Sequence, residues 1–397
     1  MAAPEDPDWS TLPEELLEYI GNMLQSRREA VKFRSICPTW RAALPFAKYI
    51  APVLMLPFGP ESLDGAVTFY TVADGGATTF TRNLPLLHGK KLCGSSRGWL
   101  ALVDEAASVT LLNPLTGTTI ELPPAVERVV GASFRLLVVT SNGSERIKLL
   151  LENGEYIFLK LDEMKKRAFR QIVLSSSSPA SGDCVAMAAL ADSGTVAFCR
   201  VGVDGAWTLL NANLPGGPIT SIIHIGGTRF LAICDRGTGG PGPISICDVG
   251  GAVPTATRVK PLYGPPKHTA WPCNYLEVNG ELYVVVTVAQ VSAPLSSHVY
   301  KCNVVAAKPS WTKVKNTHGL ILFMSTNFTV GYGGGPSISA ALERNSIYSA
   351  KPDPCRDQLE LEIIDIANGT SKLFQPCHKK IQGSGRIVCW IQPNHWA

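Results

Sequence analysis

Residues Leu92–Pro124 read LCGSSRGWLALVDEAASVTLLNPLTGTTIELPP, and this stretch decides the fold. Its apolar runs GWLALVD and SVTLLNP are short and bounded by Gly, Asn and Pro, which is typical of β-strands. Between two such runs, Asn113-Pro114-Leu115-Thr116-Gly117 has turn chemistry, because Pro fixes one backbone angle and Gly accepts a positive φ. The stretch therefore predicts neighbouring strands joined by tight turns.

The same pattern of short apolar runs bounded by turn residues recurs along the chain beyond about residue 48. The runs are RIKLLLENGEYIFLKL, GTVAFCRV with AWTLL, TRFLAICD with PISICDV, GELYVVVTVAQ with HVYKCNV, and NSIYSA with LELEIIDI. A Gly-led apolar strand, a turn and a second strand, repeated in this way, indicate a radially repeated four-stranded sheet, that is, a β-propeller. About 340 residues at about 45 per blade predict about seven blades, with six as the alternative.

A closed propeller leaves no exposed sheet edges, so its ends have to meet. We therefore expect the last strand, Arg386 to Ile391, to pair with an early strand. The two candidates are Val53 to Leu56 and Val67 to Val72.

The front of the chain has a different, helical pattern. Thr11 and Glu14 form a capping box with Pro13 in the first turn, and an apolar stripe of Leu16, Leu17, Ile20 and Leu24 follows. A second helix is predicted over about 28–36, and Pro38 can begin a third that carries Trp40, Ala43 and Leu44. Three helices in so short a segment bury too little apolar surface to be stable alone, so we expect a partner.

The front pattern, Leu12-Pro13-x-Glu-Leu-Leu, then Ile20, then Phe33-Arg34-x-Ile-Cys37-x-x-Trp40-Arg41, resembles the F-box. That resemblance implies docking on the Skp-type adaptor of a ubiquitin ligase and, through the adaptor, on a cullin. The adaptor contacts that it implies are Leu12, Pro13, Leu16, Leu17, Ile20, Val31, Ile36, Cys37 and Trp40. Some of these must also hold the helices together, and the sequence does not separate the two roles. The alternative is a helical cap on the following domain, with Leu12, Leu16 and Trp40 packed inward.

The body resembles the F-box-associated β-propeller of the plant KIB type. The tracts that carry this resemblance, in order, are residues 92–124, YLEVNGELYVVV from Tyr275, VYKCNV from Val299, WTKV from Trp311, NSIYSA from Asn345, and the ending VCWIQP. The expected fold is mostly β, with a small three-helix F-box followed by a propeller. The expected division is a disordered tail at 1–8, the F-box at 9–46 and a substrate-recognition propeller at 47–397.

Composition argues against several other classes of protein. Hydrophobic residues make up 45% of the chain and charged residues 17%, with a net charge of +4, so we expect no nucleic acid partner. No apolar run approaches the roughly 20 residues of a membrane span, and no secretory leader is recognised, so we expect a location in the cytoplasm, the nucleus or both. The 11 cysteines include no Cys-x-x-Cys pair. The one Cys/His cluster, Cys377-His378 with Cys355, is a poor metal site, and we expect neither metal nor cofactor.

No catalytic motif is present, so we expect no catalysis by this chain. The two resemblances together imply a substrate receptor of a Skp-cullin-F-box ligase that binds a target protein for ubiquitination. Two alternatives stay open: a propeller that acts as a scaffold or regulator without degradation, and a propeller that binds small molecules. Five aromatic residues on predicted inter-blade loops could either recognise the target or pack between blades. They are Trp207, Tyr263, Trp271, Phe328 and Tyr332.

Overall fold

The structure, a computed structural model, describes most of the chain in segments. The described residues are 9–13, 16–17, 19–20, 32–43, 51–58, 65–73, 76–125, 136–141, 144–150, 156–160, 168–191, 194–210, 214, 217–234, 242–259, 270–278, 280–290, 293–306, 309–315, 319–325, 328–332, 342–353, 358–374 and 387–394.

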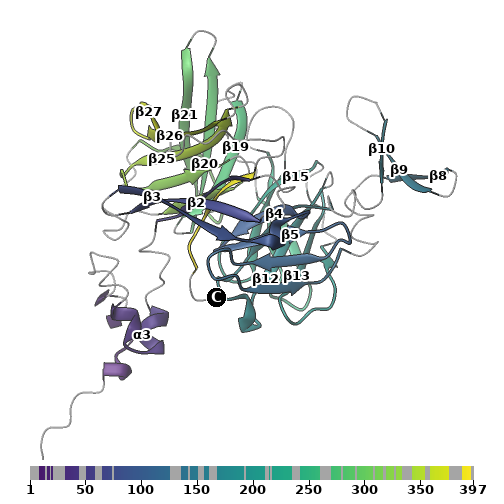
Figure 1. The fold of residues 1–397 in the computed structure, drawn as a ribbon, viewed down its shortest axis with the longest axis horizontal. Coiled ribbons are helices and arrows are strands. Elements are labelled where there is room, and N and C mark those ends of the chain that lie inside the picture. The colour runs from purple at the N-terminus through teal and green to yellow at the C-terminus, as the bar shows by residue number, and fades with distance from the viewer. Residues whose placement is uncertain are drawn as a thin grey trace, which may run out of the picture.

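The body is a ring of six blades, numbered in chain order from the first complete one. Figure 1 labels strands from every blade. Blade 1 holds β4 (Lys91–Ser96), β5 (Trp99–Val103), β6 (Val109–Leu112) and β7 (Thr119–Leu122). Blade 2 holds β11 (Phe169–Leu174), β12 (Val185–Leu190), β13 (Val196–Arg200) and β14 (Thr208–Leu209). Blade 3 holds β15 (Ile219–His224), β16 (Arg229–Cys234), β17 (Ile244–Asp248) and β18 (Thr255–Arg258).

The remaining three blades complete the ring. Blade 4 holds β19 (Ala270–Val278), β20 (Glu281–Gln290), β21 (Ala293–Cys302) and β22 (Thr312–Lys313). Blade 5 has the order β24 (Thr329–Tyr332), β23 (Ile321–Met324), β25 (Ser346–Asp353), β26 (Gln358–Asp365) and β27 (Ser371–Phe374). Blade 6 has the order β28 (Ile387–Ile391), β1 (Val53–Phe58), β2 (Ala66–Ala73) and β3 (Gly76–Asn83). Two 3-10 turns, η3 (Pro85–Leu87) and η4 (Pro179–Ser181), lie in connections.

The predicted closure of the ring is confirmed for the first of its two candidates. The last strand, β28, pairs antiparallel with β1, with Leu54 opposite Trp390 and Met55 opposite Cys389. The inner strands then contact one another in a closed cycle: β4 with β11, β11 with β15, β15 with β19, β19 with β24, β24 with β28 and β28 with β4. The blade that joins the two ends of the chain is therefore built from both of them.

Six hydrophobic clusters account for the stability of this ring, one between each neighbouring pair of blades. Alternate residues of one strand point to opposite neighbours: Trp99, Ala101 and Val103 of β5 belong to the cluster with blade 2, while Leu100 and Leu102 belong to the cluster with blade 6. Every residue of β5 is buried, because both faces of the blade are covered. This explains why its sequence is continuously apolar.

The prediction of about seven blades is wrong, and the alternative of six is confirmed. The strands β8 (Leu136–Ser141), β9 (Ser144–Leu150) and β10 (Tyr156–Lys160) form a separate three-stranded sheet, which lies apart from the blades in Figure 1. Blade 5 uses a fifth strand, and blade 4 contains strands of 10 residues. Dividing the chain length by an average blade length therefore gives too many blades, because some of these residues lengthen existing blades and others form the separate sheet.

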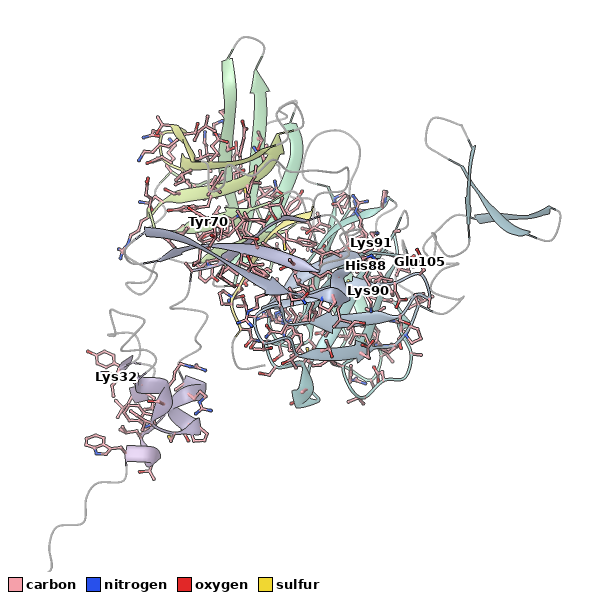
Figure 2. All side chains as sticks on the ribbon, in the orientation of Figure 1. Lys32, Tyr70, His88, Lys90, Lys91 and Glu105 are labelled. Atoms are coloured by element: carbon pink, nitrogen blue, oxygen red, sulfur yellow. The ribbon has the colours of Figure 1, made fainter. Side chains whose placement is uncertain are left out.

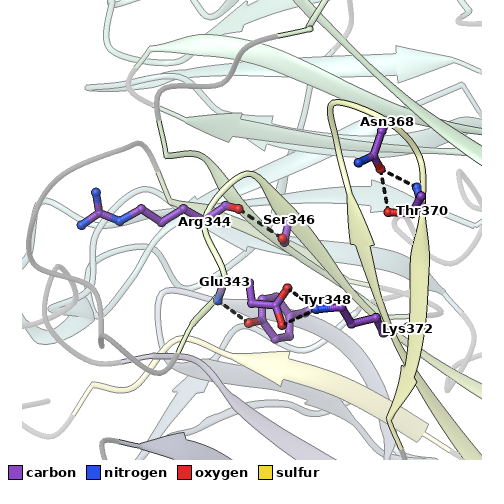
Figure 3. A network of polar contacts seen from close by, with 7 residues as sticks. All are labelled: Glu343, Arg344, Ser346, Tyr348, Asn368, Thr370 and Lys372. Carbon is purple, nitrogen blue, oxygen red and sulfur yellow. Dashed lines mark hydrogen bonds and ion pairs between the residues drawn. The ribbon is translucent and has the colours of Figure 1, made fainter.

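Blade 5 also departs from simple up-and-down order, because β23 pairs parallel with β25 while it pairs antiparallel with β24. Polar contacts hold the segment that enters β25 (Figure 3). The Glu343 N–H donates to the Tyr348 hydroxyl oxygen at 2.8 Å, and Lys372 Nζ lies 3.3 Å from the Glu343 carboxylate. Ser346 Oγ donates to the Arg344 carbonyl at 3.2 Å.

The helical front is described only in part. It contains η1 (Trp9–Thr11) and α3 (Pro38–Ala43), with further helical residues at 16–17, 19–20 and 32–35. The third predicted helix is confirmed and begins at Pro38, as expected. The first two helices are not shown as complete elements, because the residues that would join their described parts lie outside the described residues. Three whole helices are therefore not established.

Candidate functional site

The front segment has a hydrophobic core of its own. Leu17, Phe33, Trp40 and Ala43 are buried together, and Leu12, Ile20 and Cys37 pack against them while partly exposed. The rings of Phe33 and Trp40 lie with their centroids 4.5 Å apart at an angle of 45°. Within the described part of the chain this cluster contains no residue of a blade, and Figure 2 shows the segment, with Lys32 on it, standing apart from the sheets.

Hydrogen bonds join the parts of this small unit to one another. Trp40 Nε1 donates to the Trp9 carbonyl at 2.8 Å, which ties η1 to α3. Arg34 Nη1 donates to the Arg41 carbonyl at 2.8 Å, and Arg41 Nε donates to the Arg34 carbonyl at 3.3 Å. Burial lowers the pKa of Arg34, and the nearby charge of Arg41 lowers it further. The two arginines thus hold α3 to the preceding helical turn.

Apolar side chains nevertheless remain on the outside of this unit. The exposed fraction is 60% for Trp9, 49% for Leu16, 65% for Tyr19 and 53% for Ile36, and Pro13 is also exposed. We call these five residues the front apolar surface. Single exposed apolar residues are ordinary, but five on a segment this small are typical of a surface that another protein covers.

The structure separates the two roles that the sequence left open for the predicted adaptor contacts. Pro13, Leu16 and Ile36 are exposed and available to a partner. Leu17 and Trp40 belong to the core, and Leu12, Ile20 and Cys37 lie at its margin. Val31 lies outside the described residues.

Sequence reasoning missed two members of the front apolar surface, Trp9 and Tyr19. Tyr19 stands three positions after Leu16, so helical spacing could have placed both on one face. The exposure of Leu16 and the packing of Trp40 onto Phe33 also argue against the alternative of an inward-facing cap.

The loop aromatics predicted near the blades are packing residues where they are described. Trp207 is buried, its Nε1 donates to the Pro123 carbonyl at 2.6 Å, and its ring lies 4.9 Å from that of Phe169. Phe328 and Tyr332 are buried in clusters between blades. Tyr263 and the side chain of Trp271 lie outside the described residues.

The described residues contain no group of three or more His, Cys, Asp or Glu side chains that could hold a metal ion. Cys355, Cys377 and His378, the cluster considered in the sequence, lie outside the described residues. No described helix is long and apolar enough to span a bilayer.

Comparison with known proteins agrees with this architecture. A family model for the KIB1-4 beta-propeller matches residues 69–374. The Arabidopsis thaliana F-box protein SKIP23 is 30% identical over 246 residues, which are 58% of this chain and 54% of SKIP23, so the chain spans about half of that relative. Putative F-box protein At5g55150 of Arabidopsis thaliana is 25% identical over 338 residues, 82% of this chain and 80% of the relative. Arabidopsis thaliana F-box/kelch-repeat protein At1g64840 is 52% identical over 40 residues, 10% of each chain.

The match to the family model covers well over half of the chain, and it includes residues from every blade. The protein therefore belongs to the KIB1-4 beta-propeller family and resembles plant F-box proteins.

Proposed function

We propose that this protein is the substrate receptor of a Skp-cullin-F-box ubiquitin ligase. In this proposal residues 9–46 dock on a Skp-type adaptor and thereby on a cullin, and residues 47–397 hold the target protein. The observation that carries the proposal is the front apolar surface, which is exposed on a segment whose described residues bury a core of their own. The names of the relatives as F-box proteins support it.

The receptor itself makes and breaks no bond in this mechanism. It holds the target beside the charged conjugating enzyme, so that transfer of ubiquitin becomes effectively intramolecular. Holding reactants together contributes up to about 7 to 11 kcal/mol in favourable cases, and less in a flexible assembly. The propeller suits this task because six inter-blade cores make it a rigid platform.

Adaptor binding tests the first half of the proposal. The full chain, co-expressed with a Skp-type adaptor, is compared with the double variant Leu16→Arg/Ile36→Arg. Both side chains are about half exposed, so the change should leave the fold intact and weaken binding by more than 100-fold, because two charges would be desolvated in an apolar interface. The matched control is Val253→Arg in the loop after β17, where the side chain is 75% exposed on a blade.

Retention of the adaptor by the double variant would contradict the proposal, and so would equal loss in the control. Leu17→Arg and Trp40→Ala are unsuitable probes, because both residues form the core of the segment. For the second half, proteins that copurify with the tagged chain are quantified with and without proteasome inhibition. A captured protein whose level does not rise would favour a scaffold over a degradation receptor.

A further inference from the structure

The carboxyl ends of three inner strands meet around one arginine. Arg97 directly follows β4 of blade 1. Its Nε donates to the carbonyl of Leu174, the last residue of β11, at 3.1 Å. Its Nη2 lies 2.7 Å from Nδ1 of His224, the last residue of β15. The guanidinium therefore reaches across blade 2 to blade 3, at one end of the ring of inner strands.

The backbone at Arg97 is unfavourable for an arginine. Arg97 and Gly98 have φ values of 53° and 89°, so both residues of this two-residue turn are left-handed. Such turns favour Asn-Gly or Gly-Gly. The corresponding turn of blade 3 has Gly226-Gly227, both with positive φ, and that of blade 4 includes Gly280 with a φ of 79°. Arginine at this position therefore carries a backbone strain that Asn or Gly would avoid. We infer that the long, charged side chain of Arg97 has a role that Asn and Gly could not fill.

His224 is a neutral partner for this arginine. A guanidinium can only donate and a carbonyl can only accept, so His224 Nδ1 accepts from Arg97, and Nε2 donates to the Gly227 carbonyl at 2.9 Å. Burial lowers the pKa of His224, and the charge of Arg97 lowers it further. The imidazole therefore positions the guanidinium without neutralising it.

No carboxylate of the described residues forms an ion pair with Arg97. Burial lowers the pKa of Arg97, and the charge of Glu277, near the end of β19 in blade 4, offsets part of this effect. One carboxylate oxygen of Glu277 already accepts the Gly280 N–H at 2.6 Å. Among the described residues Arg97 Nη1 has no hydrogen-bond partner, and Arg97 is only half-buried. A guanidinium that is partly removed from water is usually paired with an anionic group in a folded protein.

We propose that Arg97 binds an oxyanion of the target protein, a carboxylate or a phosphate group, at this end of the propeller. The N–H groups left on Nη1 and Nη2 form an edge of the guanidinium that matches two oxygens of such a group. Leu174 and His224 fix the orientation of the guanidinium before the ligand arrives, so little side-chain entropy is lost on binding. The inference rests on the proposed function, in which the propeller holds the target.

The test uses the purified full chain with inorganic phosphate and, separately, acetate as probes. Histidine ring resonances are followed by NMR, because His224 contacts the guanidinium directly. We expect saturable shifts of the His224 signal, with a dissociation constant on the order of millimolar. The test variant is Arg97→Asn, which suits the turn and so keeps the protein folded while it removes the charge. Its affinity should fall at least 10-fold. Arg258→Asn, an exposed arginine at the end of β18, is the matched control and should leave the affinity unchanged.

A stronger response to phosphate points to a phosphorylated target, and a stronger response to acetate points to an acidic side chain or chain terminus. The inference is overturned if neither anion gives a saturable shift, or if Arg97→Asn binds as tightly as the unchanged protein. Adaptor binding by the same preparations is measured in parallel. Its absence would overturn the ligase proposal without changing the anion result, and Arg97→Asn should retain it.

Discussion

The side-chain amide of Asn113 donates a 2.6 Å hydrogen bond to the backbone carbonyl of Asn394, 281 residues later in the chain. Asn113 is fully buried, and its Oδ1 accepts the N–H groups of Leu115 and Thr116 at 3.0 and 3.2 Å. Asn394 in turn donates to the Ser177 carbonyl at 2.6 Å. One buried amide thus shapes a turn of blade 1 and holds the segment after β28, which supports the closure of the ring.

Asn113→Asp separates these two roles. The variant keeps an oxygen for the turn but places a second oxygen against the Asn394 carbonyl. We expect the free energy of unfolding to fall by about 1 to 3 kcal/mol, the cost of an unsatisfied buried group. Thermal unfolding followed by circular dichroism measures the change.

The matched control is Asn368→Asp in the exposed turn before β27, where Oδ1 accepts from the Thr370 N–H and hydroxyl at 2.8 and 2.7 Å (Figure 3). The free energy of unfolding of this control should change little, because the Asn368 side chain is exposed to solvent. Equal losses at the two sites would show that the bond to Asn394 contributes nothing.

Much of the propeller could be predicted from the sequence because its strands are buried on both faces. Such strands have continuous apolar sequences like WLALV, whose ends are marked by turn residues. The closure was also predictable, since the last strand is apolar, but its partner was narrowed only to two early strands, of which β1 is the one that pairs with β28. The blade count was not, because the strands β8, β9 and β10 resemble those of a blade in sequence yet form a separate sheet.

The front surface could be predicted only in part. A helical stripe identifies apolar residues, but Leu16 and Leu17 are adjacent in the sequence, and one is half exposed while the other is buried. Which of them faces the core depends on where Phe33 and Trp40 return to pack, and this is a tertiary property. Arg97 gave no sequence signal, because its importance depends on strand ends far apart in the chain.

Trp207→Phe should lower the stability of the propeller without changing its surface, because Trp207 is buried. The variant keeps an aromatic ring against Phe169 but removes the N–H that donates to the buried Pro123 carbonyl. The expected loss is again about 1 to 3 kcal/mol, read from chemical unfolding. Trp9→Phe is the control, because the Trp9 ring is exposed and only its backbone carbonyl makes the bond to Trp40. An unchanged midpoint for Trp207→Phe would mean that the hydrogen bond is unimportant.

Thiol reactivity should distinguish two described cysteines from the others. Burial raises the pKa of Cys93 and Cys302 to about 11 and that of Cys247 to about 12, so these thiols stay protonated and covered. Cys37 and Cys273 are only half-buried. Brief maleimide treatment of the native protein at pH 8, followed by peptide mapping, should modify Cys37 and Cys273 first. Equal labelling of Cys93 would contradict the packing between blades 1 and 2. A bound adaptor should slow labelling of Cys37 but leave that of Cys273 unchanged.

Protein stability should fall in mildly acidic solution because of His224. Burial and the neighbouring Arg97 lower the pKa of His224 from its usual 6.5 in the folded state. As the pH falls below 6.5, the unfolded chain therefore binds a proton before the folded protein does. The stability that neutral His224 provides is complete above this value and is lost as the pH falls through the folded pKa.

His224→Gln offers a neutral replacement, since its amide can accept from Arg97 and donate to the Gly227 carbonyl. Melting temperatures recorded between pH 7.5 and 5 should therefore fall less steeply for this variant than for the unchanged protein. His88→Gln, at an exposed position after η3, is the control and should follow the unchanged protein. Parallel curves for His224→Gln and the unchanged protein would show that His224 binds its proton equally in both states. The neutral contact between Arg97 and His224 would then have to be abandoned.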